Sequence, residues 1–239
     1  MRPSSSSSMV ECTRAAALVA FAVVLFFSSL PASGQQVGPT RQSRRYNANR
    51  EARIQRTIAQ TYAHRWEVGG GGGGLRFRTG PYLRQTTEIT FWGSATYNLS
   101  PRLGVLAEVR GGYGSAKIGN VLPSGNSLAY NPKVSNYNFL IGPSYRFVSK
   151  EKFSVAGFVG GGTGLGKFAG DSKGLSAADL GVWTGDYAAA FSAGVNLDYN
   201  LYQNLAVRIT PNYLGTTYGG TLQNSKGINV GFVYRFGHE

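Results

Sequence analysis

The sequence is poor in the residues that most often carry chemistry. Its single cysteine is Cys12, and its two histidines are His64 and His238. One thiol cannot form an internal disulfide or a cysteine-based metal centre, and Cys12 lies in a segment that we expect to be removed. The run of six glycines at 69–74 is followed by neither Lys-Ser/Thr nor a helical pattern, which excludes a phosphate-binding loop. The sequence therefore predicts no catalytic residue, no metal site and no cofactor.

Charged residues are also scarce, at 15% of the chain, whereas soluble domains carry about 25%. This shortage indicates that much of the surface does not face water. The charge that is present is unbalanced, with 24 Lys and Arg against 11 Asp and Glu. Such an excess fits nucleic acid, anionic lipid or a local basic segment. No nucleic-acid motif is present, and we expect no nucleic-acid partner.

The first 34 residues are typical of a secretory signal peptide. Arg2 and Arg14 precede the uninterrupted apolar run 15–27, which is shorter than the ~20 residues of a membrane-spanning helix. Small residues follow, and they suit cleavage near Gly34. An uncleaved N-terminal anchor is the alternative. A lipoprotein cysteine should follow the apolar run, and Cys12 precedes it, so no lipid anchor is expected.

The segment 35–64 is basic, with six arginines and the single acid Glu51. Ile54, Ile58 and Tyr62 recur every four residues, which predicts a helix from Asn49 onward. Either Asn47 or Asn49 is expected to cap it. We interpret the segment as a solvated periplasmic extension, and a surface for anionic lipid phosphates is the alternative. Its arginines are Arg41, Arg44, Arg45, Arg50, Arg53 and Arg56.

From Arg65 onward, apolar and polar residues alternate in segments long enough for tilted membrane strands of ~9–11 residues. In segment 87–98 one face carries Ile89 and Phe91, and the other carries Glu88 and Thr90. This pattern predicts an all-β fold over 65–237: an eight-stranded antiparallel transmembrane β-barrel. The later segments begin near Leu103, Tyr137, Phe153, Tyr187, Leu205 and Ile228.

No charge falls on the apolar face of these segments. Because a lipid-facing Arg or Lys near the midplane costs about 2–4 kcal/mol, we expect the apolar face to contact lipid. We expect a salt-bridged network in the lumen, with Glu88 and Arg110 toward the outer end and Asp198 and Arg208 toward the inner end. The alternative is that these charges only hydrate a narrow lumen. The seven charges are Glu88, Glu108, Arg110, Arg146, Asp198, Arg208 and Arg235.

Aromatic residues occupy both ends of the apolar face, as the interfacial girdles of a membrane barrel do. One predicted girdle contains Tyr113, Tyr137, Tyr187 and Tyr213. The other contains Tyr97, Phe147, Phe153, Tyr199 and Phe236.

The connections alternate between short turns and long loops, which is typical of membrane barrels. The long loops are expected at 116–135, 167–186 and 217–226. Within the second, Phe168, Leu180, Val182 and Trp183 are apolar. Phe168 and Trp183 are candidate contacts for an external partner. Packing on the barrel rim is the alternative.

Three places do not fit simple strands. Trp66 and Val68 alternate out of phase with Leu75 and Phe77, so we expect a β-bulge in the glycine run of the first strand. Pro143 and Pro211 fall inside strands, where proline removes a ladder hydrogen bond. We expect bulges there as well.

The signal-like start, the eight alternating segments and the final strand 228–236, which ends in Tyr234-Arg235-Phe236, together resemble the OmpA/OmpX-like small outer-membrane barrels. The resemblance implies the bacterial outer membrane as location, lipids as partners, and recognition of the aromatic-terminated last strand by the barrel-assembly machinery. Three residues follow Phe236, which departs slightly from the usual terminus.

The predicted function is a non-enzymatic barrel with a structural or surface-interaction role. The alternative is a narrow pore for small solutes or ions. Enzymes of this class place a His with Ser or Asp near the outer rim, but His64 and His238 are both predicted at the periplasmic end. The sequence identifies no extracellular ligand.

Overall fold

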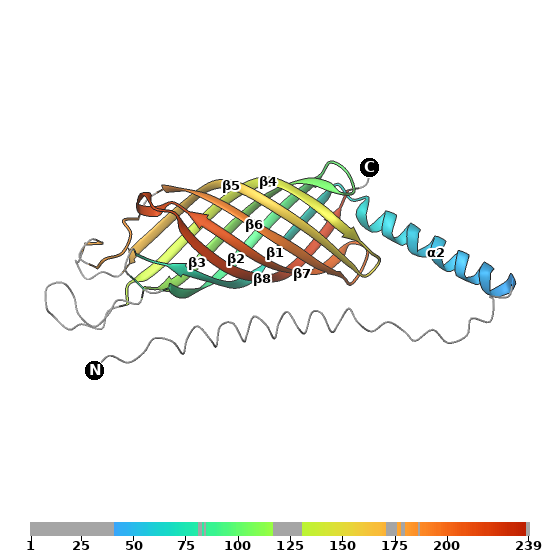
Figure 1. The fold of residues 1–239 in the computed structure, drawn as a ribbon, viewed down its shortest axis with the longest axis horizontal. Helices are drawn as coiled ribbons and strands as arrows, with labels where there is room; N and C mark the ends of the chain where they lie inside the picture. Colours follow the sequence, from blue (N-terminus) through green and yellow to red (C-terminus); the bar gives the residue numbers. More distant parts are fainter. Residues whose placement is uncertain are drawn as a thin grey trace, which may run out of the picture. The chain divides into compact units, whose positions relative to one another are not determined.

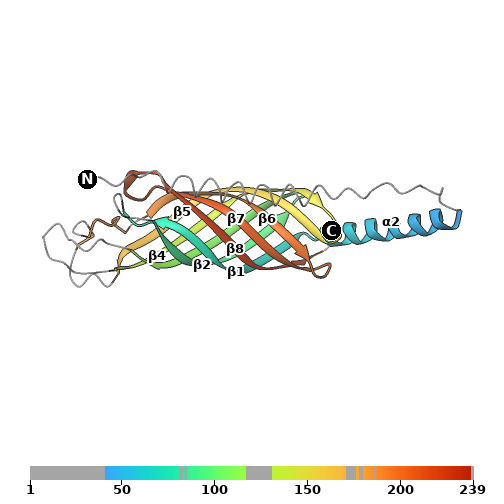
Figure 2. The same ribbon diagram turned by 60° about the horizontal axis from the view of Figure 1, so that its bottom comes forward.

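The strands of the chain close into one antiparallel barrel, in which each strand pairs with its sequence neighbours and β1 pairs with β8. The computed structural model describes residues 41–80, 83, 85–116, 131–170, 176–177, 180–185 and 187–237. Figures 1 and 2 show the strands tilted around the barrel axis. The strands are β1 (Trp66–Arg78), β2 (Gln85–Asn98), β3 (Leu103–Ser115), β4 (Lys133–Ser149), β5 (Phe153–Gly170), β6 (Tyr187–Asn200), β7 (Leu205–Thr216) and β8 (Gln223–Phe236).

The two ends of the barrel differ in their connections. Turns of three or four residues join β2 to β3, β4 to β5 and β6 to β7 at one end, which we call the turn end. The other end, the loop end, carries the longer connections and the 3₁₀ turn η1 (Tyr218–Gly220). The chain enters β1 and leaves β8 at the turn end, where the Arg65 amide donates to the Gly237 carbonyl at 2.9 Å.

One helix, α2 (Arg41–Tyr62), precedes the barrel. It begins earlier than Asn49, and both proposed caps, Asn47 and Asn49, lie inside it, so the capping prediction was wrong. Asn is a moderate helix residue that tolerates interior positions when its side chain faces solvent, and Asn47 and Asn49 are exposed. No helix in the described part of the chain is long and apolar enough to cross a bilayer. The predicted signal peptide, 1–34, lies outside the described residues.

Side chains alternate between a polar interior and an apolar exterior. Along β2, Thr86, Glu88 and Thr90 are buried, whereas Ile89 is 77% exposed. This inverts the arrangement of a soluble barrel, whose apolar side chains face inward. Exposed apolar side chains occur on the outer faces of all eight strands, as a membrane barrel requires.

The first strand contains no bulge. Its register with β2 is continuous from Trp66, opposite Tyr97, to Arg78, opposite Gln85. Leu75 and Phe77 point inward and are 1% and 0% exposed. The expected bulge assumed that every apolar residue of β1 faces lipid. The strand instead uses apolar residues on both faces, because the loop end of the lumen is itself apolar.

The two prolines also fit without a shift of register. Pro143 stays opposite Val105, and Pro211 stays opposite Ile228. The pairing of β4 with β5 and that of β6 with β7 are interrupted at the prolines, but both continue in the same register on either side. The expected bulges at the prolines are therefore wrong. Each proline is outward and exposed, and its missing N–H interrupts the ladder on one side only. The bulges of β4 lie elsewhere, between Lys133 and Ser135 and between Arg146 and Val148.

The long loops are shorter than predicted, because β4 begins at Lys133, β5 continues to Gly170 and β8 begins at Gln223. The β5 segment remains a strand through its glycines. Glycine within a strand often marks a place where a neighbouring backbone approaches closely, and the glycines of β5 are compatible with such an approach.

Close approach explains the glycine run where β1 meets β8. A Cβ built on Gly71, which points inward, would lie 2.1 Å from the Val230 carbonyl oxygen. A Cβ on its outward neighbour Gly72 would meet only the Thr90 carbonyl oxygen at 3.5 Å, an ordinary contact. The inward glycines therefore permit closure of the barrel, and the outward ones do not restrict it.

We expect Gly71→Ala to destabilise the barrel by about 1–3 kcal/mol through overpacking against β8. Gly72→Ala is the matched control, and it should change the free energy of unfolding by less than about 0.5 kcal/mol. Urea titration of protein in lipid vesicles measures both. Equal effects of the two substitutions would contradict the close approach.

Candidate functional site: the filled lumen

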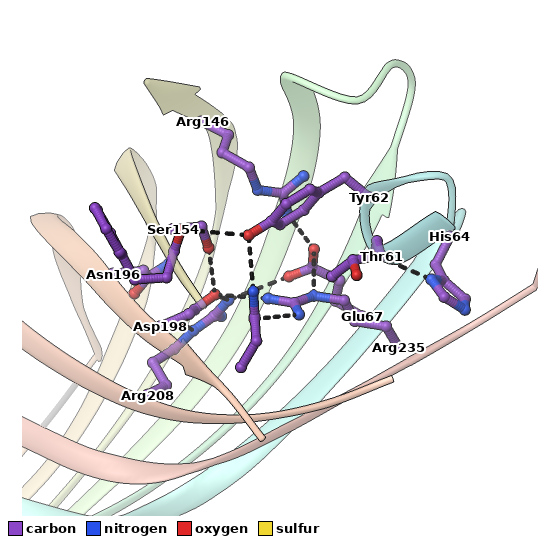
Figure 3. Close-up of polar contacts among 12 residues, drawn as sticks. Thr61, Tyr62, His64, Glu67, Arg146, Ser154, Asn196, Asp198, Arg208 and Arg235 are labelled. Atoms are coloured by element: carbon purple, nitrogen blue, oxygen red, sulfur yellow. Dashed lines mark hydrogen bonds and ion pairs between the residues drawn. The ribbon is translucent and has the colours of Figure 1, made fainter. Parts of the chain in front are cut away.

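Five charged side chains meet inside the turn end of the barrel (Figure 3). They come from five strands: Glu67 (β1), Arg146 (β4), Asp198 (β6), Arg208 (β7) and Arg235 (β8). All are buried, with exposures of 6% or less. The sequence placed four of them inside the lumen. Glu67 was not among the predicted charges.

Glu67 is the centre of this cluster, which we call the turn-end charge cluster. Its Oε1 accepts from Arg146 and, at 3.3 Å, from Arg235, and its Oε2 accepts from Arg208 at 3.1 Å. Arg208 also donates two hydrogen bonds to Asp198, at 2.6 and 2.8 Å. Arg235 reaches Asp198 at 3.0 Å. Three guanidinium groups and two carboxylates leave one net positive charge in a buried space.

Tyr62, the last residue of α2, closes the turn end beneath this cluster. Its ring lies 4.8 Å from the guanidinium carbon of Arg146 and 5.4 Å from that of Arg235. The electron-rich face of an aromatic ring attracts such cations. The hydroxyl donates to the Lys150 carbonyl at 2.9 Å and accepts from Asn200 Nδ2 at 2.9 Å. Tyr62 is only 4% exposed, so the end of the helix is part of the barrel's interior packing.

The residues after Tyr62 are also fixed to the barrel. His64 Nδ1 lies 3.1 Å from the Thr61 carbonyl, and the His64 carbonyl accepts from Asn98 Nδ2 at 3.0 Å. His64 is buried and belongs to this junction. Within the described residues, no group of three or more His, Cys, Asp or Glu side chains is arranged to bind a metal ion.

A second pair of charges lies further along the lumen. Glu108 and Arg110, both on β3, form an ion pair, and Arg110 also donates to Asn212 Oδ1 at 2.7 Å. Glu88 joins neither cluster: its Oε2 accepts from Asn136 Nδ2. Its other oxygen is buried without a hydrogen-bond partner among the described residues. The structure therefore does not pair Glu88 with Arg110.

Apolar side chains fill the loop end of the lumen. Phe77 stacks on Phe168 with ring centroids 5.9 Å apart, and Tyr218 packs edge-on against Phe168 at 4.9 Å. We call this the loop-end apolar cluster. Burial and the nearby Glu88 carboxylate raise the pKa of Tyr218 above its ordinary value, so its hydroxyl stays neutral. Its members are Leu75, Phe77, Ala116, Val134, Leu140, Phe168, Leu180, Val182, Ala188, Ala190, Leu214 and Tyr218.

This cluster corrects the prediction of exposed loop contacts. Phe168 is 1% exposed, and Leu180 and Val182 are also buried. Trp183 is partly buried and packs against the same cluster. Phe168 belongs to β5 and points inward, because the strand extends past the glycines where a loop was expected. These side chains pack at the loop end of the barrel, as the alternative interpretation expected.

The predicted girdle residues lie on the outer surface. At the loop end, the Tyr113 and Tyr137 hydroxyls share a hydrogen bond, and the Tyr213 hydroxyl donates to Asn224. At the turn end, Trp66 packs on Tyr97 at 4.8 Å. Trp66 was not in the predicted girdle. The remaining predicted aromatics are outward and exposed: Phe147, Phe153, Tyr187, Tyr199 and Phe236.

The filled lumen leaves little space. One cavity beside Glu67, Arg146 and Arg208 and another beside Glu108 and Ser192 each measure about 10 Å³. This is close to the smallest volume that holds one water molecule. The lumen is therefore closed to solutes larger than water, and most of its buried charges are paired with charges of opposite sign.

We expect Glu67→Gln to destabilise the barrel by about 3–5 kcal/mol, because it leaves three buried arginines with one carboxylate. Glu51→Gln is the matched control, since Glu51 is exposed on α2 and should change stability by less than about 1 kcal/mol. Urea unfolding in lipid vesicles gives both values. If Glu67→Gln lowers the free energy of unfolding no more than the control does, the ion pairs of Glu67 do not stabilise the barrel.

Comparisons with known proteins rest on structure. No protein-family model matches the chain, and no curated protein matches it in sequence. Solved structures do match it. The outer membrane protein OprG from Pseudomonas aeruginosa aligns at 11% identity and a TM-score of 0.53, covering 74% of this chain and 99% of OprG. Neisserial surface protein A aligns at 11% identity and a TM-score of 0.50, covering 72% and 97%.

The attachment invasion locus protein Ail of Yersinia pestis, solved with the heparin analogue sucrose octasulfate, aligns at 19% identity and a TM-score of 0.48, covering 72% and 97%. At these identities the likeness concerns the fold alone. In fold, the chain is a closed eight-stranded transmembrane β-barrel that resembles the OmpA/OmpX-like small outer-membrane barrels.

Proposed function

We propose that this protein is a non-enzymatic barrel of the bacterial outer membrane with a structural or surface-interaction role. The observation that carries the proposal is the filled lumen. The turn-end charge cluster and Tyr62 close one end, and the loop-end apolar cluster closes the other. A barrel filled in this way supplies a stable surface on both sides of a membrane without a path through it.

The exterior supports the location. Its exposed apolar side chains form a band with aromatic residues at both borders, as expected where hydrocarbon meets headgroups. The turn end is then periplasmic and the loop end extracellular, because short turns are periplasmic in this fold. The basic segment that begins at Gln35 extends into the periplasm, and the predicted signal peptide delivers the chain there.

Assembly and partners follow from the same features. Membrane lipids contact the apolar band. The last strand, β8, ends with outward Phe232, Tyr234 and Phe236, which suits recognition by the barrel-assembly machinery. An extracellular ligand would meet the loop end.

A narrow pore is the second candidate. Inward glycines such as Gly160, Gly194 and Gly231 are the feature that favours it, because they leave room in a lumen. A Cβ on Gly231 would, however, lie 2.2 Å from the Gly70 carbonyl oxygen. At Gly231, therefore, the neighbouring strand β1 occupies the space that a side chain would fill, and the glycine does not widen the lumen.

Planar-bilayer recording tests the closed lumen. We expect the inserted wild-type protein to give no large, steady single-channel currents, because ions would have to cross both the buried charges and the apolar cluster. A general porin inserted by the same procedure controls for detection.

Tyr62→Ala should also stay closed, because the loop-end apolar cluster is intact in that variant. Steady currents through the wild type would overturn the closed-barrel proposal and support the pore. Heat-modifiable migration in gels, with recovery in the outer-membrane fraction, checks location separately.

A further inference from the structure

A small cavity adjoins the turn-end charge cluster, and we call it the cluster cavity. Its volume is about 10 Å³, close to the smallest space that holds one water molecule. Glu67 contributes the only carboxylate of its lining, and most of the other lining side chains can donate hydrogen bonds. Besides Glu67, Arg146 and Arg208 of the cluster, the lining includes Thr96, Arg102 and Ser144.

Arg146 has a donor that the cluster does not use. Its Nη1 donates to the Pro101 carbonyl at 2.8 Å, its Nη2 donates to Glu67, and its guanidinium lies over the Tyr62 ring (Figure 3). Its Nε is buried without a hydrogen-bond partner among the described residues. Buried polar atoms in proteins are nearly always satisfied, so an unpaired N–H on a residue that lines a cavity indicates a ligand there.

The carboxylates of the cluster are occupied by other donors. Glu67 accepts from Arg146 Nη2, from Arg235 at 3.3 Å and from Arg208 at 3.1 Å. Asp198 accepts from Arg208 and Arg235. The partner of Arg146 Nε is therefore neither acid of the cluster.

The charge of the cluster decides which kind of ligand fits. Its three arginines and two acids leave one net positive charge, and every member is 6% or less exposed. Arg102, which is exposed and lines the same cavity, adds a further positive charge, and none of the ion pairs of the described residues includes it. Buried charge is unfavourable unless it is neutralised. A water molecule would satisfy Arg146 Nε and leave the charge, whereas an anion does both.

The size of the cavity restricts the anion. A space of about one water molecule is too small for phosphate, sulfate or an organic carboxylate, and halide ions are the anions nearest to water in size. The hydroxyls of Thr96 and Ser144, which line the cavity, can donate to such an ion. Because Arg102 is exposed, an ion can enter beside it from the turn end without crossing the lumen.

We propose that the cluster cavity binds one halide ion, which is chloride under physiological conditions. Arg146 Nε–H donates to the ion, the Thr96 and Ser144 hydroxyls complete its contacts, and Arg102 attracts it to the entrance. The bound ion neutralises the excess charge of the turn-end charge cluster, so the stability of the barrel depends on chloride. This inference goes beyond the proposed function. An ion held at one end of a closed lumen carries no current, so bilayer recording and halide binding fail independently.

Bromide locates the site directly, because it substitutes for chloride and gives an anomalous X-ray signal. Crystals of the folded protein grown in sodium bromide should show an anomalous peak within hydrogen-bond distance of Arg146 Nε. A water molecule in the cavity and no anomalous peak there would overturn the proposal.

Urea unfolding in lipid vesicles measures the response in solution. The ratio of folded to unfolded protein at a fixed urea concentration should rise about tenfold between ~1 and ~100 mM chloride, which corresponds to a dissociation constant of about 10 mM. Gluconate, which is too large for the cavity, keeps the ionic strength constant, so screening does not change. A ratio that does not respond to chloride would contradict the site.

Arg102→Gln should reduce this response to less than about threefold, because it removes a charge that attracts the ion. Arg50→Gln is the matched control: Arg50 is exposed on α2, and its removal should leave the response within about twofold of the wild type. Equal responses of the two variants would overturn the site, because chloride would then not distinguish Arg102 from another exposed arginine.

Ser144→Asp tests the charge argument, because it places a carboxylate where the ion would bind. This variant should lose the chloride response and, at low chloride, match the stability of the wild type at high chloride. Ser144→Asn has nearly the same size without the charge, so it should lose the response and stay no more stable than the wild type at low chloride. An aspartate variant no more stable than the asparagine variant would overturn the proposal. If neither variant folds, the bromide peak and the response of Arg102→Gln still decide.

Discussion

An eight-stranded barrel has an interior that side chains can fill completely, so every inward residue must find a partner inside. This constraint gives Glu67 its importance. Arg146, Arg208 and Arg235 reach inward from three different strands, and all three donate to its carboxylate. Among the described residues, Asp198 would be the only acid left in contact with them without Glu67. The position of Glu67 on β1, the strand that closes the barrel against β8, connects this neutralisation directly to barrel closure.

The two halves of the lumen satisfy the same constraint in different ways. The turn half buries charges and neutralises them, and the loop half buries aromatic and aliphatic side chains. Burying a charge is unfavourable unless it is paired and hydrogen-bonded, which explains why Tyr62 and Asn200 add contacts to the arginines that the carboxylates leave incompletely satisfied. Apolar filling needs no such pairing. In the loop half, residues of the connection between β5 and β6, such as Leu180 and Val182, can therefore complete the apolar cluster.

The strand pattern was predictable because lipid excludes charge from one face of every strand, and that exclusion is visible as alternation. The sequence could not show what fills the interior. Leu75 and Phe77 were interpreted as lipid-facing because apolar residues were assumed to face outward, and this assumption led to a bulge that β1 does not have. Glu67 had a usable signal, since it lies between the outward Trp66 and Val68. Tyr62 had none, because its role depends on where a helix end meets two turns and two arginines far away in sequence.

Charge position is more informative than charge number in this protein. The segment 35–64 before the barrel is rich in arginine, with six arginines against the single acid Glu51. The barrel has its own pattern, however. Its described inward charges include both signs and are largely paired, whereas outward cations occur at the strand ends and none occurs in the apolar band between them. A membrane explains both halves of this pattern, because hydrocarbon excludes outward charge from the middle of the strands and anionic headgroups favour cations at their ends.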